Sequence, residues 1–567
     1  MKLSLTKNRI PYSIFIISCY LWGFLAHGMA LTNKYCFHDD QYALFMVSGT
    51  YNYGRWMMGV LGKLESILFF GHYSTPLISG IYMLTCIAAA GCMILRMFEI
   101  TDKGSSISLA GAMTSLPVIT SLFGYMSWGG YHITSLLMAV AGVFVLEMGV
   151  MDQPPVIKNR KDAKILRIIM LLLAIALLAC STGIYQAYFP FGCALMLIYY
   201  LQQVLHRQPS LKKFLIGAAA HVAAAVAALY LYLAGTKFFV RLLHTQVVDY
   251  ASLNTLGTAG SMLDYPARIP LAYRQFFAPA RDTVYDMYPW TIRIFYYILL
   301  AALIILLFTV VSRKVKSAEK VSGTLLAIEC IILAAVFPLA VNLIFVLSDL
   351  ESVHTLMMYP VVSIPIAVIV LLKEADGASE PIDEAMGSPE LTNTVSPVES
   401  RTAELSKEGK NNTGRNCKPV SVIYAVPVCL LLLMNLAYCR YDNVCYLKAE
   451  FLQQQAIGYF TTLAARMQSV QGYRDGMPVL YLNPQSKSAE TLVYDPEFDE
   501  IHIIPYGDRT VINSYTWPDF MRRWCGYGPT YIAEPEGFKE RQDIKEMPHY
   551  PNDGSIRIID DVLVVKF

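Results

Sequence analysis

Long apolar runs recur along most of this chain and restrict its fold more than any other feature. A membrane-spanning helix needs roughly 20 consecutive apolar residues, and about eleven runs approach that length. The runs cover residues 10–31, 76–97, 107–126, 131–151, 166–182, 185–205, 214–235, 292–311, 321–347, 354–372 and 419–438. Charged residues form only 16% of the 567 residues, whereas soluble proteins carry about a quarter. The sequence therefore predicts an all-α polytopic membrane domain over residues 1–438 with about eleven spans.

Basic residues predict how these spans are oriented, because Lys and Arg collect in short cytoplasmic loops. They fall before the first run and after the fourth, sixth and eighth runs: Lys2, Lys7, Arg9, Lys158, Arg160, Lys161, Lys164, Arg207, Lys212, Lys213, Arg313, Lys314, Lys316 and Lys320. The alternate loops at 127–130 and 348–353 contain neither residue type. The N-terminus is therefore expected in the cytoplasm, and the loops at 32–75 and 236–291 outside. The net charge of +2 does not indicate a nucleic-acid partner.

Two later segments have a different composition. Residues 374–418 are rich in Glu, Ser, Thr, Pro and Gly, which is typical of a disordered linker, here a cytoplasmic one. Residues 439–567 have the composition of a soluble domain, with a helical pattern at 446–470 and strand patterns at 478–482, 500–504 and 556–567. Asp560 and Asp561 are expected to turn the last strand pattern into a hairpin. We predict a small external α/β domain.

Several kinds of chemistry find no support in the sequence. There is no phosphate-binding loop, no dinucleotide fingerprint and no metal-binding Cys or His spacing. Most of the 12 cysteines lie in apolar runs, although Cys439, Cys445 and Cys525 could pair in an oxidising compartment. We expect no cofactor and no protein-bound metal site. A divalent cation is not indicated, although the acidic pair described next leaves room for one.

An acidic pair, Asp39-Asp40, directly follows the first apolar run. Two carboxylates at the mouth of a membrane helix are costly unless they face water or serve a function. Residues 41–70 then mix apolar and charged side chains, as in a helix at the membrane surface. A carboxylate there could act as the general base on an acceptor hydroxyl. We prefer Asp40 as the base because it lies nearer the interfacial helix, and the second carboxylate would raise the base's pKa, bind a cation or orient the acceptor.

A transferase acting outside the cell needs an activated donor that the membrane can deliver. A polyprenyl-phosphate sugar is such a donor, and its phosphate leaving group needs cations or hydrogen-bond donors to hold it. The acceptor would be a polysaccharide or a glycolipid. Candidate substrate-binding residues on the external side are His38, Arg55, Trp56, Tyr185, Gln186, Arg268 and Arg274.

Each of these residues also has a purely structural explanation. The acidic pair could cap a helix. Arg55 could extend from an interfacial helix to water, and Trp56 could anchor that helix at the membrane surface. Tyr185 and Gln186 could simply pack or satisfy a helix end, and the two arginines of the second external loop could be surface charges.

Three motifs together resemble a known family. Asp39-Asp40, Gly54-Arg55-Trp56 and the sequence Gly183 to Tyr188 are similar, in this order, to the serotype-converting O-antigen glucosyltransferases of bacteria. These are polytopic membrane enzymes of the GT-C type. The resemblance implies an essential acid in the first external loop and transfer of glucose or a related sugar from a lipid phosphate to a surface polysaccharide or its lipid-linked precursor. It also implies a bacterial inner membrane. The linker at 374–418 departs from the family pattern.

Two other functions remain open. A lipid or polysaccharide transporter or flippase would carry ionisable residues deep in its spans and internal repeats. Glu147 and Glu329 are the clearest such residues, and no repeat is visible. A structural or sensory membrane protein with an external polymer-binding domain would not need Asp39 and Asp40.

Overall fold

The computed structural model describes residues 10–35, 40, 50–68, 75–151, 160–248, 259–278, 290–348, 353, 355–377, 422–483 and 516–567. His38 and Asp39 lie outside these residues. So do the strand expected at 500–504 and nearly all of the predicted linker.

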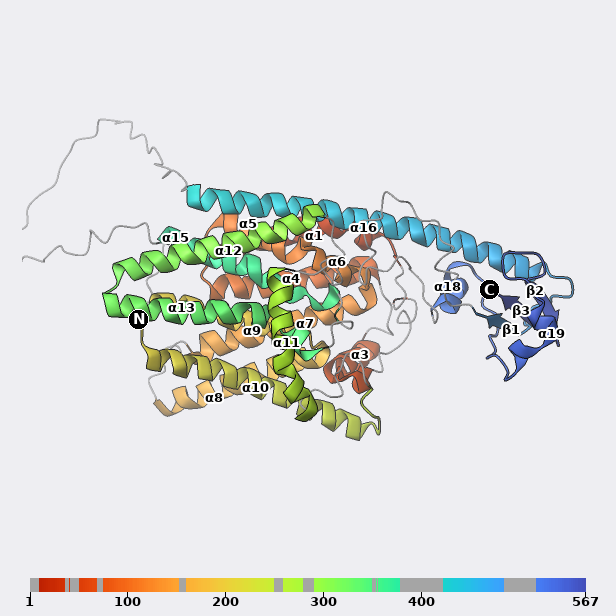
Figure 1. Cartoon of the computed structure of the whole chain (residues 1–567), viewed down its shortest axis with the longest axis horizontal. Coiled ribbons are helices and arrows are strands. Elements are labelled where there is room, and N and C mark those ends of the chain that lie inside the picture. The colour runs from red at the N-terminus through yellow and green to blue at the C-terminus, as the bar shows by residue number, and fades with distance from the viewer. Residues whose placement is uncertain are drawn as a thin grey trace, which may run out of the picture.

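The membrane domain is a bundle whose main helices run roughly along one axis (Figure 1). They are α1 (Tyr12–Thr32), α4 (Pro76–Met97), α5 (Lys103–Ser115), α6 (Pro117–Gly124), α7 (Met126–Val145), α8 (Arg160–Ile184), α9 (Tyr188–His206), α10 (Leu211–Leu242), α12 (Trp290–Ser317), α13 (Lys320–Val341), α15 (Ser363–Gly377) and α16 (Val422–Gln468). The π-helical turn η2 (Leu146–Met151) extends α7.

Nine helices in the described part of the chain are long and apolar enough to cross a membrane, and α5 with α6 can form a tenth, bent span. The bend of 47° falls at Pro117, because proline cannot donate the hydrogen bond that would continue α5. The region expected to hold a tenth apolar run contains α15, which has only 15 residues. The prediction of a polytopic helical membrane protein is confirmed, while the count of about eleven spans stays a prediction.

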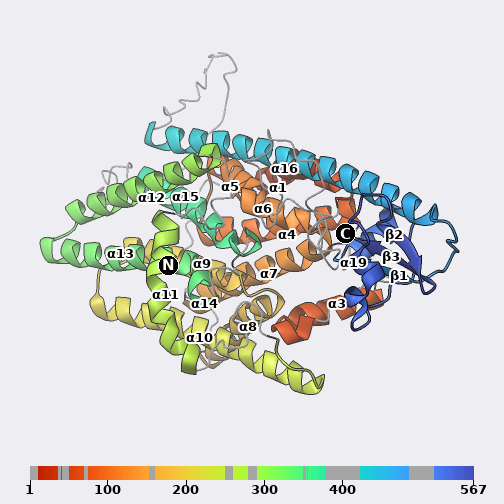
Figure 2. The same cartoon turned by 45° about the vertical axis from the view of Figure 1, so that its right-hand side comes forward.

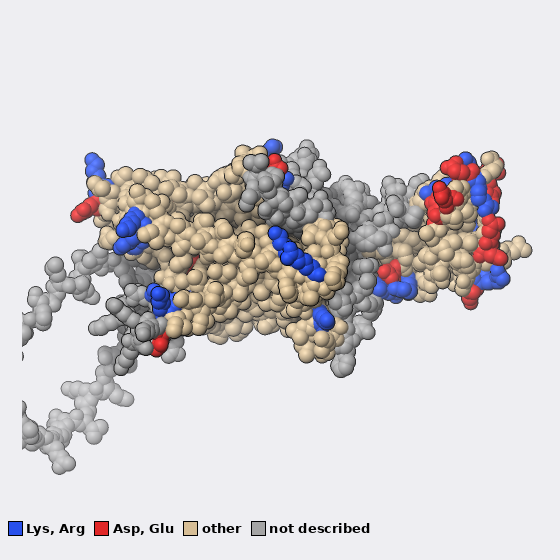
Figure 3. All heavy atoms as spheres, turned by 90° about the horizontal axis from the view of Figure 1, so that it is seen from below, with Lys and Arg blue, Asp and Glu red and all other residues tan. Residues whose placement is uncertain are grey.

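The outer surface of the bundle is apolar. Large side chains on α8 and α10 point outward, among them Leu172 (61% exposed) and Tyr230 (73% exposed). The face shown in Figure 3 carries few charged side chains over the bundle, whereas the C-terminal domain carries both signs. A soluble protein rarely exposes a continuous apolar surface of this kind, so the outward faces are suited to lipid.

Shorter elements complete the bundle: η1 (Thr50–Tyr53), α3 (Trp56–Leu68), α11 (Ala259–Phe277), α14 (Ile344–Leu347), η6 (Thr355–Met357) and η7 (Tyr359–Val362). The α11 helix lies across the other helices (Figure 1). Tyr273 Oη donates to the carbonyl of Ala335 in α13 at 2.6 Å. The segment expected to be an external loop therefore contains the last turns of α10 and a packed helix, which two prolines had disguised.

The α16 helix is a single element of 47 residues, about 70 Å long at 1.5 Å per residue. It runs along one side of the bundle and continues into the C-terminal domain (Figures 1 and 2). The helix expected at 446–470 is the second half of α16 rather than a separate element. The described cysteines form no disulfide, Cys439, Cys445 and Cys525 included.

The C-terminal domain contains α18 (Trp517–Trp524), η9 (Phe538–Glu540), α19 (Gln542–Lys545) and three strands, β1 (Val479–Leu482), β2 (Ile556–Ile559) and β3 (Val562–Lys566). The strand order is β1-β3-β2, with β1 parallel and β2 antiparallel to β3. Asp560 and Asp561 join β2 to β3 with φ of 51° and 60°, as a tight hairpin turn requires. The structure thus has the predicted hairpin.

Candidate active site

The carboxylate of Asp40 is fully buried and anchored on two sides. Its Oδ1 accepts a hydrogen bond from the backbone N–H of Ser127 at 3.1 Å, and a second from the Ser127 hydroxyl. Its Oδ2 pairs with Lys34 Nζ at 3.2 Å. Ser127 lies in the first turn of α7, so Asp40 satisfies a free N–H at a helix start, where negative charge is favoured. The helix-capping explanation considered for the acidic pair therefore fits Asp40.

The segment that carries Asp40 is also held by α16. Gln453 Nε2 donates to the backbone carbonyl of Lys34 at 3.0 Å. The next residue, Tyr35, stacks on Tyr446 of α16, with ring centroids 5.9 Å apart. Burial, together with the charge of nearby Glu450, raises the pKa of Tyr35 to about 12, so its phenol stays neutral. The long C-terminal helix thus helps to fix the position of the acidic segment.

Gly54 begins the second motif and fits closely against the third. Its φ of +69° favours glycine, and a Cβ there would lie 2.6 Å from the hydroxyl of Tyr232. Gln186 Nε2 donates to the carbonyl of Tyr53 and to Tyr232 Oη, both at 3.1 Å. Gln186 therefore holds the turn that leads into α3.

Trp56 fills a slot between α8 and α10. A Cβ on Gly183 would lie 2.6 Å from the Trp56 ring, and one on Gly235 would lie 2.7 Å from it. The ring stacks on Phe239 at 5.5 Å, and Trp56 Nε1 donates to the carbonyl of Tyr232 at 3.2 Å. These contacts show a packing role for Trp56, which attaches the start of α3 to the bundle.

Arg55 of the second motif contacts Tyr185 of the third motif, which adds to the hydrogen bond between Gln186 and Tyr53. The guanidinium carbon lies 4.9 Å from the centroid of the Tyr185 ring, a cation–π distance. Tyr185 also stacks on His132 of α7, with centroids 4.1 Å apart and an angle of 16° between the rings. The structure thus brings Arg55, Tyr185 and Gln186 together, although Arg55 is 130 positions from Tyr185 in the sequence.

The first two turns of α7 join these contacts to Asp40. Ser127 binds Asp40, Tyr131 donates to the carboxylate of Glu65 in α3, and His132 stacks on Tyr185. Asp40 and Tyr185 were predicted as site residues, whereas Ser127, Tyr131, His132 and Glu65 were not. The available signal was weak: a short, uncharged loop before an apolar helix does not reveal which neighbours its polar side chains will meet.

The two predicted arginines of the segment before α12 lie elsewhere. Arg268 and Arg274 belong to α11, and the side chain of Arg274 is exposed. Their predicted role in substrate binding stays a prediction.

Three buried carboxylates form pairs between helices away from this site. Glu147 pairs with His221 at 3.0 Å, Glu329 with Arg207 at 3.2 Å and Glu374 with His206 at 2.7 Å. Glu147 and Glu329 were the residues that a transporter would use. Their pairing gives both a structural explanation and favours no transport pathway.

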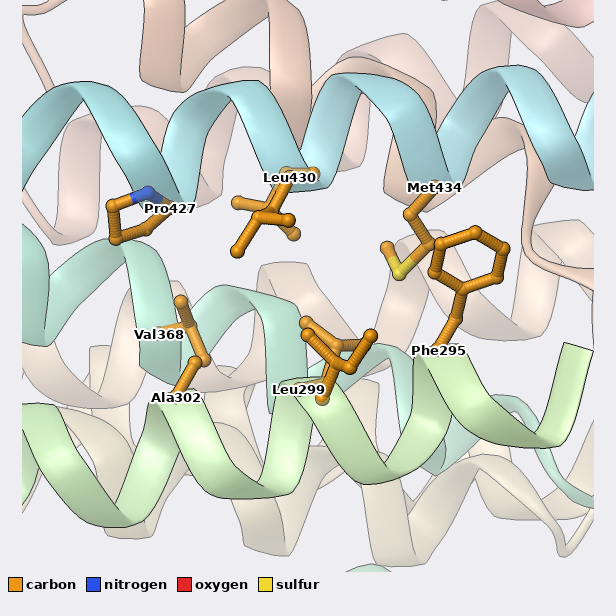
Figure 4. Close-up of a pocket in the computed structure, with 9 residues that line it drawn as sticks. Phe295, Leu299, Ala302, Val368, Pro427, Leu430 and Met434 are labelled. Atoms are coloured by element: carbon orange, nitrogen blue, oxygen red, sulfur yellow. The ribbon is translucent and has the colours of Figure 1, made fainter.

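A pocket between α12, α15 and α16 is apolar (Figure 4). It is lined by Phe295, Ile298, Leu299, Ala302, Val368, Pro427, Leu430, Leu431 and Met434. Its lining side chains carry no group that could move a proton or hold an anion. Among the described residues, no group of three or more His, Cys, Asp or Glu side chains could hold a metal ion.

Comparison with known proteins gives one match. A family model described as "Glucosyl transferase GtrII" matches residues 28–364, a span that includes all three motifs and α7. No curated protein and no solved structure gives a significant match.

Proposed function

Because the chain belongs to the GtrII glucosyltransferase family, we propose that it transfers glucose from a polyprenyl-phosphate donor to a cell-surface polysaccharide or its lipid-linked precursor. We further propose that the reaction occurs at the external face of a bacterial inner membrane, with the N-terminus in the cytoplasm and the C-terminal domain outside.

One observation supports the site most directly: Asp40 and the Arg55–Tyr185 pair both contact the first two turns of α7. Asp40 of the acidic pair contacts α7 directly, and the cation Arg55 of the second motif is linked to α7 through Tyr185. This arrangement suits a transfer that needs a base at the acceptor and a cation at the leaving phosphate.

The proposed reaction is a displacement at the anomeric carbon. A carboxylate of the acidic pair takes the proton of the acceptor hydroxyl, whose oxygen bonds to the anomeric carbon. The bond between that carbon and the phosphate oxygen breaks, and polyprenyl phosphate leaves with both electrons. Glucose is thereby joined to the acceptor.

The hydrogen bonds to Asp40 support different roles for the two residues of the acidic pair. Both of its oxygens already accept hydrogen bonds, from Ser127 and Lys34, so the proposed role for Asp40 is to hold the segment in place. Asp39 then becomes our candidate for the base, in place of the Asp40 preferred from sequence. His38, Arg268 and Arg274 keep their proposed substrate-binding roles without support from described contacts.

The test measures sugar transfer in membranes given labelled polyprenyl-phosphate glucose and envelope acceptor. We expect Asp39→Asn to reduce the rate by about 100-fold or more, the range of general-base catalysis. Asp40→Asn should lower both the rate and the melting temperature, because it weakens the anchor on α7. The exposed Asp553 provides a control in Asp553→Asn, which should transfer normally.

Two results would contradict the proposal in different ways. Full activity in both Asp39→Asn and Asp40→Asn would remove the acidic pair from the mechanism. Transfer from a nucleotide sugar, with none from any polyprenyl-phosphate sugar, would refute the donor class while leaving glycosyl transfer intact.

A further inference from the structure

His132 is a buried polar residue that the proposed reaction has not yet used. It lies on α7 and is only 4% exposed. Its Nδ1 has no hydrogen-bond partner among the residues that the structure describes. Leaving such a nitrogen unpaired in a protein interior costs free energy, and an unsatisfied buried group in a native protein calls for an explanation such as a bound molecule.

The surroundings of His132 indicate what would bind there. Its ring lies flat against Tyr185, and the guanidinium of Arg55 lies against that same tyrosine. The imidazole of His132 and the guanidinium of Arg55 therefore lie against the same ring, and both groups carry N–H donors. Two donors, one of them a permanent cation, suit an anion with several oxygens.

We propose that His132, together with Arg55, binds the phosphate of the lipid-linked sugar donor, an inference that rests on the proposed function. Nδ1–H of His132 donates to a phosphate oxygen. When the bond to the sugar breaks, negative charge grows on the leaving phosphate, and donors already in place stabilise it without rearrangement. Tyr185 holds both donors in position and need not contact the sugar.

The position of His132 on α7 also relates this site to the acidic pair. Ser127, which binds Asp40, lies five residues earlier, and five residues of helix rise about 7.5 Å. The acidic pair and the phosphate would therefore lie at two levels of one helix, with the side chains of Ser127 and His132 about 140° apart around its axis at 100° per residue.

Binding to the purified full-length protein tests the inference without relying on turnover. Three probes are compared: polyprenyl phosphate, the matching polyprenol without phosphate, and inorganic phosphate. His132→Phe keeps an aromatic ring against Tyr185 but removes the N–H. His132→Asn retains an N–H near the position of Nδ1. Thr134→Val, on the same helix, removes the bond between Thr134 and Tyr82 and serves as the control.

We expect the wild type and Thr134→Val to bind polyprenyl phosphate more tightly than polyprenol. His132→Phe should weaken polyprenyl phosphate binding by about 10- to 100-fold, the worth of one hydrogen bond to a charged group, and leave polyprenol binding unchanged. His132→Asn should recover part of the affinity. In transfer assays, His132→Phe should raise the KM for the donor as well as lower kcat.

The possible failures are distinguishable. If the wild type and His132→Phe bind polyprenyl phosphate equally, and both prefer it to polyprenol, His132 is not the phosphate ligand and the proposed function stands. If the wild type does not distinguish polyprenyl phosphate from polyprenol, the lipid-phosphate donor fails and the inference with it. A third result would also overturn the inference: inorganic phosphate binds as tightly as polyprenyl phosphate, and His132→Phe weakens the binding of inorganic phosphate alone. The site would then serve free phosphate.

Discussion

The partners of Asp40 predict that this residue supports activity by holding its segment in place. Its carboxylate is buried, and a buried charge is tolerated only while its partners remain. Lys34 supplies the opposite charge and Ser127 the hydrogen bonds. Loss of activity on mutating Asp40 would therefore not by itself identify it as the base, which is why stability and rate must be measured together.

The pair between Lys34 and Asp40 gives a prediction at this scale. Lys34→Met should lower the free energy of unfolding by about 3 kcal/mol, because removing one partner leaves a buried charge uncompensated. Adding Asp40→Asn should restore most of the loss, since the charge is then gone. Melting temperatures of the single and double variants in detergent provide the measurement.

A surface pair provides the comparison for that cycle. Lys539 and Glu534 lie 2.7 Å apart but are 46% and 31% exposed, so Lys539→Met should change the melting temperature little. If the losses in Lys34→Met and Asp40→Asn simply add, the two residues are not coupled and the anchoring role of Lys34 is wrong.

At the level of elements, the position of helix α3 depends on the packing of Trp56 between α8 and α10. The slot between α8 and α10 exists because Gly183 and Gly235 lack side chains. The same insertion places Arg55, one residue earlier, beside Tyr185. Packing at Trp56 and the position of the arginine are therefore linked.

Gly183→Ala tests this link. Its added Cβ would approach the Trp56 ring to 2.6 Å, and overpacking of this kind costs about 1–3 kcal/mol. We expect lower stability and weaker donor binding, with partial recovery when Trp56→Phe is added. Gly458→Ala offers a matched control: Gly458 is also helical, but nothing lies within 4 Å of its Cβ position, so alanine should be neutral or stabilising. Equal effects of the two alanines would show that the slot is not tight.

Hydropathy predicted the helices well, because lipid demands long apolar helices whatever their neighbours are. It did not predict α11, where Pro266 and Pro270 hide a helix that tertiary contacts support. Nor did it predict that the helix expected from Tyr446 onward is part of α16, because the polar residues just before Tyr446 indicated a boundary between two elements. The meeting of Arg55 with Tyr185 depends on helix packing across 130 positions, for which one sequence contains no signal.

Over the whole molecule, α16 connects three regions that the sequence suggested were separate. Asn435 Nδ2 donates to the carbonyl of Ser108 in α5 at 2.9 Å, which fixes α16 within the bundle. Further along, Gln453 holds the carbonyl of Lys34 beside Asp40. In the C-terminal domain, the ring of Phe460 stacks on Trp517. A disturbance of α16 near Gln453 should therefore reach both the segment that carries Asp40 and the C-terminal domain.

Gln454→Pro would make that disturbance at an exposed position of α16. Proline removes one helical hydrogen bond and clashes with the carbonyl four residues earlier, so a kink should form beside the contact between Gln453 and Lys34. We expect sugar transfer to fall by about tenfold or more relative to Gln454→Ala, which keeps the helix straight. Affinity for polyprenyl phosphate should change little, because the ring contacts that place His132 and Arg55 are made with Tyr185. If the two variants transfer sugar equally and both are present at normal levels, α16 merely tethers the C-terminal domain. If only Gln454→Pro loses transfer, the straight course of α16 keeps the segment that carries Asp40 in its working position.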